Sequence, residues 1–232
     1  PPRSTLFPYT TLFRSQALYE GIRIKGEGQI GLITYMRTDS TNISGDAIAS
    51  ARNFIESSYG SAYLPEKPNF YTSSNKDAQE AHEAIRPTDA KRHPDKLPAS
   101  IDEDQRRLYR LIWSRFVACQ MTNARWNRTE IFMVRHDKET GALFKTAGRT
   151  LAFAGFYKAS GVPSSDSEQN LPDLQENAPL FPFDIATKQL FSSPLSRYSE
   201  ASLIKELEKQ GIGRPSTYAT IIDVIQIGRA HV

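Results

Sequence analysis

A tyrosine and an arginine lie two residues apart in the segment Gly31–Ser40, which reads GLITYMRTDS. If residues 30–37 are extended, side chains alternate between faces, so Tyr35 and Arg37 share a face with Ile33. A phenol oxygen is a workable nucleophile for phosphorus, and a guanidinium can bind a phosphate through two hydrogen bonds and stabilise its charge. The pair suggests phosphoryl transfer, although a strand with a core tyrosine and a surface arginine has the same spacing.

Two further segments of unusual composition follow the first along the chain. They are residues 79–88, QEAHEAIRPT, and residues 197–220, RYSEASLIKELEKQGIGRPSTYAT. In type, order and spacing the three segments resemble the type IA family of bacterial DNA topoisomerases. The resemblance extends over residues 16–226 and suggests an internal fragment of such an enzyme.

The resemblance implies a function for the first segment. Tyr35 would attack a backbone phosphodiester of single-stranded DNA and become linked to the 5′ phosphate, while Arg37 binds the phosphate being cleaved. The phosphotyrosine bond keeps the energy of the broken diester, so resealing needs no ATP. The intact parent would relax negatively supercoiled DNA by cleaving one strand and passing another through the break.

The other two segments supply further candidate site residues. His82 resembles a family histidine near the active site and could donate a hydrogen bond to phosphate, but a half-buried structural histidine is equally compatible. Arg86 is either a phosphate contact or a charge that complements a helix C-terminus, and we favour the second. The resemblance assigns DNA binding to Arg214, with Ser216 and Thr217 as donors to phosphates or as caps of a helix start. Gly213 would let the backbone approach a phosphate.

Composition limits the class of protein. The chain has 232 residues, of which 39% are apolar and 24% charged, and no apolar run is long enough to span a membrane. Cys119 is the single cysteine, so no internal disulfide forms. We expect a cytoplasmic, monomeric protein without a membrane anchor.

Residues 86–128 carry ten Lys/Arg and five Asp/Glu, a local net charge of +5. Such a stripe suits nucleic acid, or is simply a solvated helix face.

The predicted fold class is α+β: a helical, tyrosine-bearing domain inserted in a β-rich arch and followed by a helix pair. We expect residues 16–30 to lead into a helical domain over 31–128, with the arch over 129–195. The start of a helical DNA-binding domain then covers 196–226. Residues 1–15 lack any helical or strand period, and both 1–15 and 227–232 are expected to be non-native tails.

Local patterns predict the individual elements. Helices are expected over 44–58, over a short segment starting at a cap at Asp77 and ending before Pro87, and over 100–120 with a cap at Ser100. On the third, the inward face is predicted to hold Leu108, Ile112, Phe116 and Cys119. Strands are expected over 130–136, 143–157 and 179–191, with a turn over 137–141. The final helix pair starts at Ser199 and Pro215, with Gly211 ending the first helix.

Mg²⁺ is expected in the intact parent, with its ligands outside this chain. The consecutive Asp102, Glu103 and Asp104 are predicted to cap a helix rather than bind metal. The resemblance implies that these ligands lie in an acidic N-terminal domain of the parent, and without that domain the fragment is expected to be inactive alone.

Two other functions compete with the enzyme. The chain could be a non-catalytic nucleic-acid-binding module built on the final helix pair and the basic stripe. A tyrosine recombinase also uses a tyrosine nucleophile, but the order of its motifs does not fit this sequence.

Overall fold

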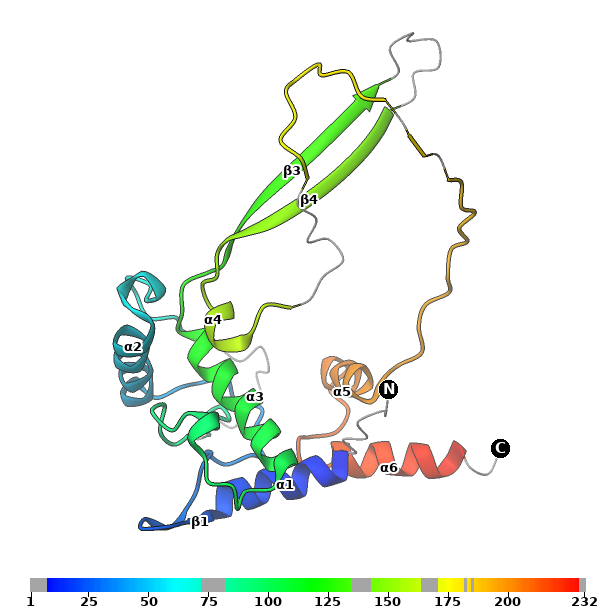
Figure 1. The fold of residues 1–232 in the computed structure, drawn as a ribbon. Coiled ribbons are helices and arrows are strands. Elements are labelled where there is room, and N and C mark those ends of the chain that lie inside the picture. Colours follow the sequence, from blue (N-terminus) through cyan, green and yellow to red (C-terminus); the bar gives the residue numbers. More distant parts are fainter. Residues whose placement is uncertain are drawn as a thin grey trace. The chain divides into compact units, whose positions relative to one another are not determined.

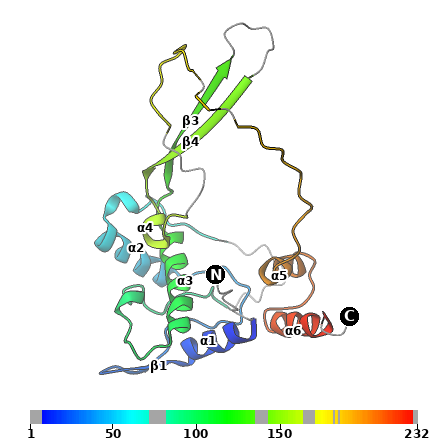
Figure 2. The same ribbon diagram turned by 45° about the vertical axis from the view of Figure 1, so that its right-hand side comes forward.

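The computed structural model describes residues 8–71, 82–134, 143–163, 171–181, 183–184 and 186–229. Contacts divide the chain into two compact units (Figures 1 and 2). The helical unit comprises Pro1–Ala124, Ala154–Val162 and Ser199–Val232, and the β unit comprises Arg125–Phe153 and Pro163–Tyr198. The predicted α+β class is confirmed. The change from helical to β structure falls four residues before the predicted bound of 128/129, and the chain returns to the helical unit over 154–162.

The helical unit begins with helix α1, Pro8–Glu20, and the short antiparallel hairpin of β1, Ile22–Ile24, and β2, Gly28–Ile30. Although residues 1–15 show no helical period in the sequence, α1 starts at Pro8. Its last turns are tied to the rest of the unit: Leu18 is fully buried, and Arg14 forms an ion pair with Asp104.

Helix α2, Gly45–Tyr59, follows the sequence pattern closely. Ala47, Ile48, Ala51 and Ile55 form its buried face, and Gly60 ends it with a positive φ of 93°. A 3-10 turn η1, Ser61–Tyr63, follows, and a second, η2, Pro94–Lys96, precedes the longest helix.

That longest helix is α3, Glu103–Cys119, and its cap is Asp102 rather than the predicted Ser100. The Asp102 carboxylate accepts hydrogen bonds from the backbone N–H groups of Asp104 and Gln105, which the first helical turn leaves without partners. The buried face is also rotated from the expected one: Tyr109, Trp113, Phe116 and Val117 are buried, whereas Leu108 and Ile112 lie at the margin.

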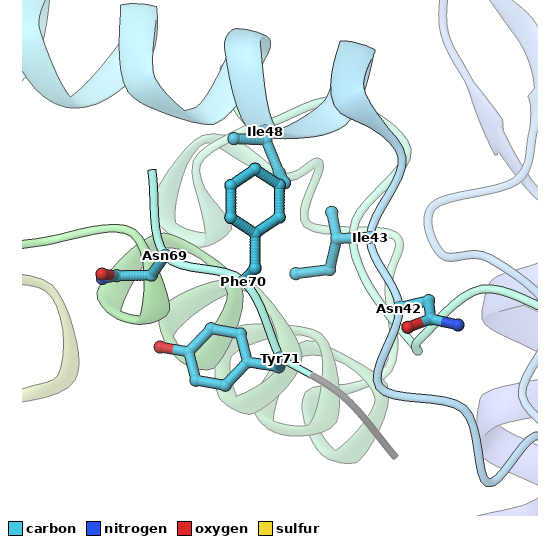
Figure 3. A pocket seen from close by; sticks show the side chains of 6 residues that line it. All are labelled: Asn42, Ile43, Ile48, Asn69, Phe70 and Tyr71. Atoms are coloured by element: carbon cyan, nitrogen blue, oxygen red, sulfur yellow. The ribbon is translucent and has the colours of Figure 1, made fainter. Parts of the chain in front are cut away.

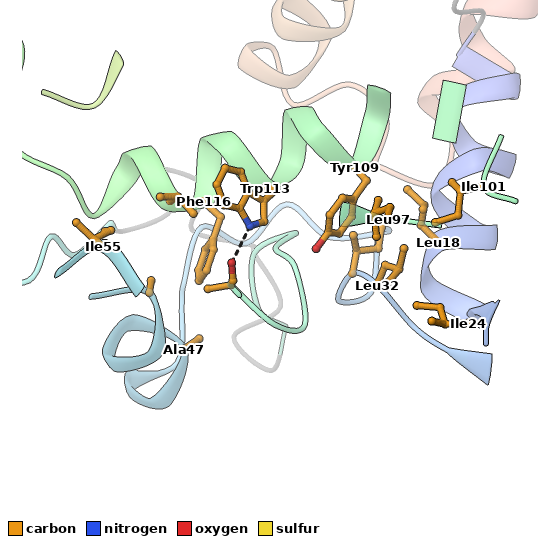
Figure 4. Packing of buried hydrophobic residues seen from close by; sticks show 14 of the residues in the cluster. Leu18, Ile24, Leu32, Ala47, Ile55, Leu97, Ile101, Tyr109, Trp113 and Phe116 are labelled. Carbon is orange, nitrogen blue, oxygen red and sulfur yellow. Dashed lines mark hydrogen bonds between the residues drawn. The ribbon is translucent and has the colours of Figure 1, made fainter. Parts of the chain in front are cut away.

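One hydrophobic cluster joins α1, α2 and α3 (Figure 4). Its buried polar groups are satisfied: the Trp113 indole donates to the Ala90 carbonyl at 2.8 Å, and the Tyr109 hydroxyl donates to the Arg92 carbonyl at 2.8 Å. Because leaving such groups unpaired costs about 1–3 kcal/mol each, these bonds determine how the 90–92 loop lies against α3.

The β unit contains an antiparallel pair, β3, Arg125–Val134, and β4, Leu143–Phe153. The predicted turn over 137–141 lies outside the described residues. The strand predicted over 179–191 is wrong, since the described residues of that range form no strand and leave Phe181, Phe183 and Phe191 exposed. A strand needs a neighbouring strand to accept and donate its backbone hydrogen bonds. An apolar sequence does not provide that neighbour, and Pro179 lacks an N–H to donate.

After β4 the chain returns to the helical unit through α4, Tyr157–Ser160. Helix α5, Glu200–Lys209, starts at the predicted cap Ser199, which forms a capping box with Ser202. Helix α6, Tyr218–Arg229, contacts α1. The second helix begins three residues after the predicted Pro215, because residues 215–217 form a turn. No helix in the described part of the chain is long and apolar enough to cross a membrane.

Candidate active site

The segment that contains Tyr35 is held from both sides by backbone hydrogen bonds. The Leu32 N–H donates to the Leu18 carbonyl of α1 at 2.7 Å, and Ile33 forms a single antiparallel bridge with Pro87. Leu32 and Ile33 are both buried, so the predicted alternation of faces over residues 30–37 is wrong. Contacts on two sides of a short irregular segment replace the half-buried strand that the sequence suggested.

Thr34 joins the first and second motifs. Its N–H donates to the Arg86 carbonyl at 2.9 Å, its hydroxyl donates to the Ala84 carbonyl at 2.8 Å, and the same hydroxyl accepts from the Arg86 N–H at 2.9 Å. The helix expected to end before Pro87 is therefore wrong over its described part, since residues 82–86 are not helical. Its expected start at Asp77 lies outside the described residues. These bonds to Thr34 take the place of helical bonds.

Tyr35 follows directly and stands between two rings. The Tyr19 ring of α1 lies edge-on at a centroid distance of 5.5 Å and an interplanar angle of 73°, and the His82 ring lies at 5.7 Å. The Tyr35 side chain is 39% exposed, and its hydroxyl has no hydrogen-bond partner among the described residues. The arrangement positions the ring through contacts and leaves the phenol oxygen available.

Arg37 is exposed two residues further on, and within the described part of the chain its guanidinium has no ion-pair or hydrogen-bond partner. A guanidinium that is not committed to a carboxylate can bind an anion bidentately. Both the phenol of Tyr35 and the guanidinium of Arg37 are therefore exposed, and their pairing on one phosphate stays a prediction.

Arg86 is bound to neighbouring groups of the second motif. Its side chain is only 16% exposed, and its guanidinium donates to the Glu83 carboxylate at 2.7 Å and to the Pro87 carbonyl at 3.1 Å. Because residues 82–86 are not helical, Arg86 does not end the helix that the favoured dipole role required. Glu83 in turn accepts from the Ser44 N–H at the start of α2. Arg86 thus links the second motif to α2 through Glu83.

The environment of Glu83 shifts its acidity. Burial raises the pKa of this carboxyl, but the hydrogen bonds from Ser44 and the charge of Arg86 outweigh burial, and the pKa lies below its ordinary value. Glu83 is accordingly a carboxylate at neutral pH.

Arg214, Ser216 and Thr217 are all exposed in the turn that precedes α6. The Thr217 hydroxyl accepts from the Arg214 N–H at 2.9 Å, which stabilises the turn and uses one donor of the expected anion site. Gly213 does not face open space: a Cβ there would lie 3.0 Å from the Tyr218 ring, so its glycine accommodates that ring. The close approach of a phosphate to the Gly213 backbone stays a prediction.

Charges connect this turn to the first motif. Burial raises the pKa of Tyr218, the negative charges of Glu208 and Asp39 add to the rise, and Arg214 opposes it. Asp39 lies two residues after Arg37, and both Asp39 and Arg214 act on the pKa of Tyr218. The turn before α6 is therefore close enough to the Tyr35 segment for their charges to interact with the same group.

The basic stripe over 86–128 is largely neutralised within the molecule. Arginines in it pair with carboxylates at Arg86, Arg92, Arg106, Arg107, Arg110 and Arg128. The stripe is therefore better described as a solvated helix face with internal ion pairs than as a surface for nucleic acid.

The three consecutive acidic residues Asp102, Glu103 and Asp104 lie at the start of α3. In the part of the chain that is described, no group of three His, Cys, Asp or Glu side chains could hold a metal ion. Asp102 caps α3, Glu103 pairs with Arg107, and Asp104 pairs with Arg14, so the prediction that these three side chains serve the helix start is confirmed. They do not fit Mg²⁺.

Sequence reasoning missed Tyr19 and Thr34 as parts of the site. Tyr19 lies in a stretch without a recognisable motif, and nothing in its spacing indicates a contact with Tyr35. The strand pattern places Thr34 only on the face opposite Tyr35. A threonine hydroxyl can both donate and accept a hydrogen bond, and it is therefore able to bridge two segments.

Comparisons with known proteins agree with the motifs. A family model described as DNA topoisomerase matches residues 5–229. DNA topoisomerase 1 of Rickettsia felis is 49% identical over 220 residues, 93% of this chain and 28% of that protein. The Pseudomonas aeruginosa enzyme of the same name is 48% identical over 217 residues, 93% of this chain and 23% of that protein.

A solved structure shows the same fold. Full-length topoisomerase I from Thermotoga maritima superposes with a TM-score of 0.74 at 32% identity, covering 96% of this chain and 35% of that one. The chain thus spans about a quarter of the curated relatives it matches. The family match over nearly the whole chain, together with the joined motifs around Tyr35, shows that this chain belongs to the type IA DNA topoisomerase family.

Proposed function

We propose that this chain is the nucleophile-bearing part of a type IA topoisomerase that relaxes negatively supercoiled DNA without ATP. The names of the relatives support DNA topology as the activity of the parent. The substrate would be a single-stranded segment of that DNA, and the parent would act as a monomer in the cytoplasm.

The chemical step is a transesterification. The Tyr35 phenol oxygen attacks a backbone phosphorus, an O–P bond to tyrosine forms, and the bond from phosphorus to the 3′ oxygen breaks. The phenol proton leaves with the 3′ hydroxyl, and the 5′ phosphate stays on Tyr35. Reversal of the same step reseals the strand, since the energy of the diester is conserved in the phosphotyrosine link.

Neighbouring side chains would assist this step. Arg37 would bind the phosphate that is cleaved and stabilise its charge. His82, within ring contact of Tyr35, would donate a hydrogen bond to the phosphate. Arg214, Ser216 and Thr217 would contact the strand further along its backbone. Arg86 would act by holding the second motif in place, because its guanidinium is bound to Glu83.

A single observation carries the proposal: an accessible tyrosine without a hydrogen-bond partner for its hydroxyl in the described part of the chain, next to a histidine ring and close in sequence to an unpaired arginine. A tyrosine that served only the core would be buried, as Tyr109 is, with its hydroxyl donating to a carbonyl. The described residues lack a ligand set for Mg²⁺, so we propose that the rest of the parent supplies it.

The test is covalent capture of a labelled single-stranded oligonucleotide. The chain would be mixed with the remainder of the parent polypeptide and Mg²⁺, and denatured samples would be examined for protein-linked DNA. We expect capture with the wild-type chain, none with Tyr35→Phe, and normal capture with the control Tyr198→Phe, which removes the hydroxyl of another exposed tyrosine.

Two results would contradict the proposal. Capture that persists in Tyr35→Phe would exclude Tyr35 as the nucleophile. Oligonucleotide binding without any capture would favour the alternative of a non-catalytic binding module. For the chain alone, we expect no relaxation of a supercoiled plasmid.

A further inference from the structure

A small hollow lies beside the candidate active site in the helical unit. It has a volume of about 170 Å³ and is lined by Asn42, Ile43, Ile48, Asn69, Phe70 and Tyr71 (Figure 3). None of these side chains is charged. Ligand sites for drug-sized molecules have volumes of roughly 300–1,000 Å³, so this hollow suits a single flat ring rather than a whole nucleotide.

Two aromatic rings form part of its wall and remain accessible. Phe70 is 76% exposed and Tyr71 is 45% exposed, and neither belongs to the hydrophobic core cluster. An exposed phenylalanine contributes little to folding, because most of its apolar surface still contacts water. The Phe70 ring is therefore available for contact with a ligand.

The backbone that bears these rings is anchored. The Tyr71 hydroxyl donates to the Cys119 carbonyl at 2.8 Å, and the Asn69 amide donates to the same carbonyl at 2.9 Å. The Gln120 side chain exchanges two hydrogen bonds with the Asn69 backbone, at 3.2 and 2.8 Å. The aromatic pair is thus held at the end of α3 before any ligand binds, which lowers the entropy lost on binding.

Hydrogen bonds connect the hollow to the Tyr35 segment. The Asn42 carbonyl accepts from the Ala84 N–H at 2.7 Å, and the Ala84 carbonyl accepts from the Thr34 hydroxyl at 2.8 Å. One residue therefore separates the hollow's wall from the backbone that precedes Tyr35. Thr34 directly precedes Tyr35, so the wall of the hollow and the proposed nucleophile belong to one hydrogen-bonded network.

We propose that this hollow binds one base of the single strand that Tyr35 attacks, with Phe70 as the stacking face. Stacking on an aromatic ring does not require a particular base, because every base has a π-face. None of the six lining side chains is negatively charged, so none of them would repel the phosphate attached to a bound base. The inference rests on the proposed function, since it takes single-stranded DNA as the ligand.

Binding of a fluorescently labelled oligothymidylate of eight nucleotides to the 232-residue chain tests the proposal. Loss of one stacked base typically weakens binding by roughly five- to a hundredfold, and we expect a loss in this range for Phe70→Ala. Phe70→Tyr should bind as the wild type does, because it keeps the ring. Phe181→Ala is the matched control, since it removes an equally exposed phenylalanine, 85% exposed, from the β unit.

Photochemical crosslinking places the base directly. In oligonucleotides with one 5-iodouracil, we expect crosslinks at Phe70 or Tyr71 from one position of the strand, and replacing that position by an abasic site should remove the effect of Phe70→Ala. Equal affinities of Phe70→Ala and Phe181→Ala, or crosslinks exclusively elsewhere, would overturn the proposal. Another part of the parent polypeptide would then be the occupant.

The same measurements separate this inference from the proposed function. Phe70→Ala that weakens binding, in a chain whose Tyr35 fails to capture DNA, would support the base site and contradict the nucleophile. Covalent capture by Tyr35, with no effect of Phe70→Ala on binding, would support the nucleophile and contradict the base site.

Discussion

Thr34 and Arg86 exchange two hydrogen bonds although 52 residues separate them in the chain. The Thr34 N–H donates to the Arg86 carbonyl and the Arg86 N–H donates to the Thr34 hydroxyl, both at 2.9 Å. This exchange brings the second motif beside Tyr35, and with it the His82 ring. The order within the site therefore depends on a side chain that takes no part in the proposed chemistry.

Replacing Thr34 should reveal that dependence. Thr34→Val keeps the shape but leaves the Arg86 N–H and the Ala84 carbonyl without their partner, which costs about 1–3 kcal/mol of unfolding free energy. Thr34→Ser keeps the hydroxyl and should lose less. Urea denaturation followed by tryptophan fluorescence measures both, and equal stabilities of Thr34→Val and wild type would contradict the assigned role.

The ring of Tyr19, and not its hydroxyl, should affect the rate at which Tyr35 captures DNA. Tyr19→Phe keeps the edge-on contact at 5.5 Å, so we expect normal covalent capture in the reconstituted assay. Tyr19→Leu removes the contact and lets the nucleophile's ring move, for which we expect a decrease in capture rate on the order of ten- to a hundredfold.

Oligonucleotide affinity provides the control for Tyr19, because a residue that positions the nucleophile should alter the capture rate and leave binding unchanged. A parallel loss of affinity in Tyr19→Leu would indicate a DNA contact instead.

Gly31 is required by the close approach of α1. A Cβ at this position would lie 2.6 Å from the Tyr19 carbonyl oxygen, and the adjacent bond from Leu32 to Leu18 keeps the two backbones together. We expect Gly31→Ala to reduce the unfolding free energy by about 1–3 kcal/mol or more. Gly45→Ala is the matched control: a Cβ there meets nothing within 4 Å, so its effect should stay within about 0.5 kcal/mol. Thermal unfolding distinguishes the pair.

The ion pair of Glu83 and Arg86 should make stability depend on pH. The pKa of Glu83 is lowered in the folded chain, so its contribution is fully present above the ordinary glutamate pKa and is lost as pH falls through the folded value. At pH 7 we expect Glu83→Gln to lower the unfolding free energy by roughly 0.5–1.5 kcal/mol.

The wild type and Glu83→Gln should converge once the pH falls below the lowered pKa of Glu83 in the folded chain, because the wild-type carboxyl is then protonated. Glu66→Gln, at an exposed side chain, serves as the control and should track the wild type at every pH. A wild-type advantage that persists undiminished at pH 3 would show that the charge of Glu83 does not contribute.

The sequence by itself determined the class, the helices with strong patterns and the family. The apolar spacing over 44–58, the cap at Ser199 and the motif around Tyr35 are local signals, and the structure has α2, α5 and an accessible tyrosine where these signals indicate them. Such features depend on neighbours within a few residues, which is why they can be inferred from spacing and residue type.

Only the tertiary structure decided how the site is assembled. The contact of Tyr19 with Tyr35, the bonds of Thr34 to residues 84–86 and the burial of Arg86 against Glu83 all join segments far apart in sequence. The same holds for the failed predictions: residues 82–86 are not helical because Thr34 supplies their partners, and residues 179–191 lack a neighbouring strand. Backbone groups must be paired, and local sequence does not say which distant segment will pair them.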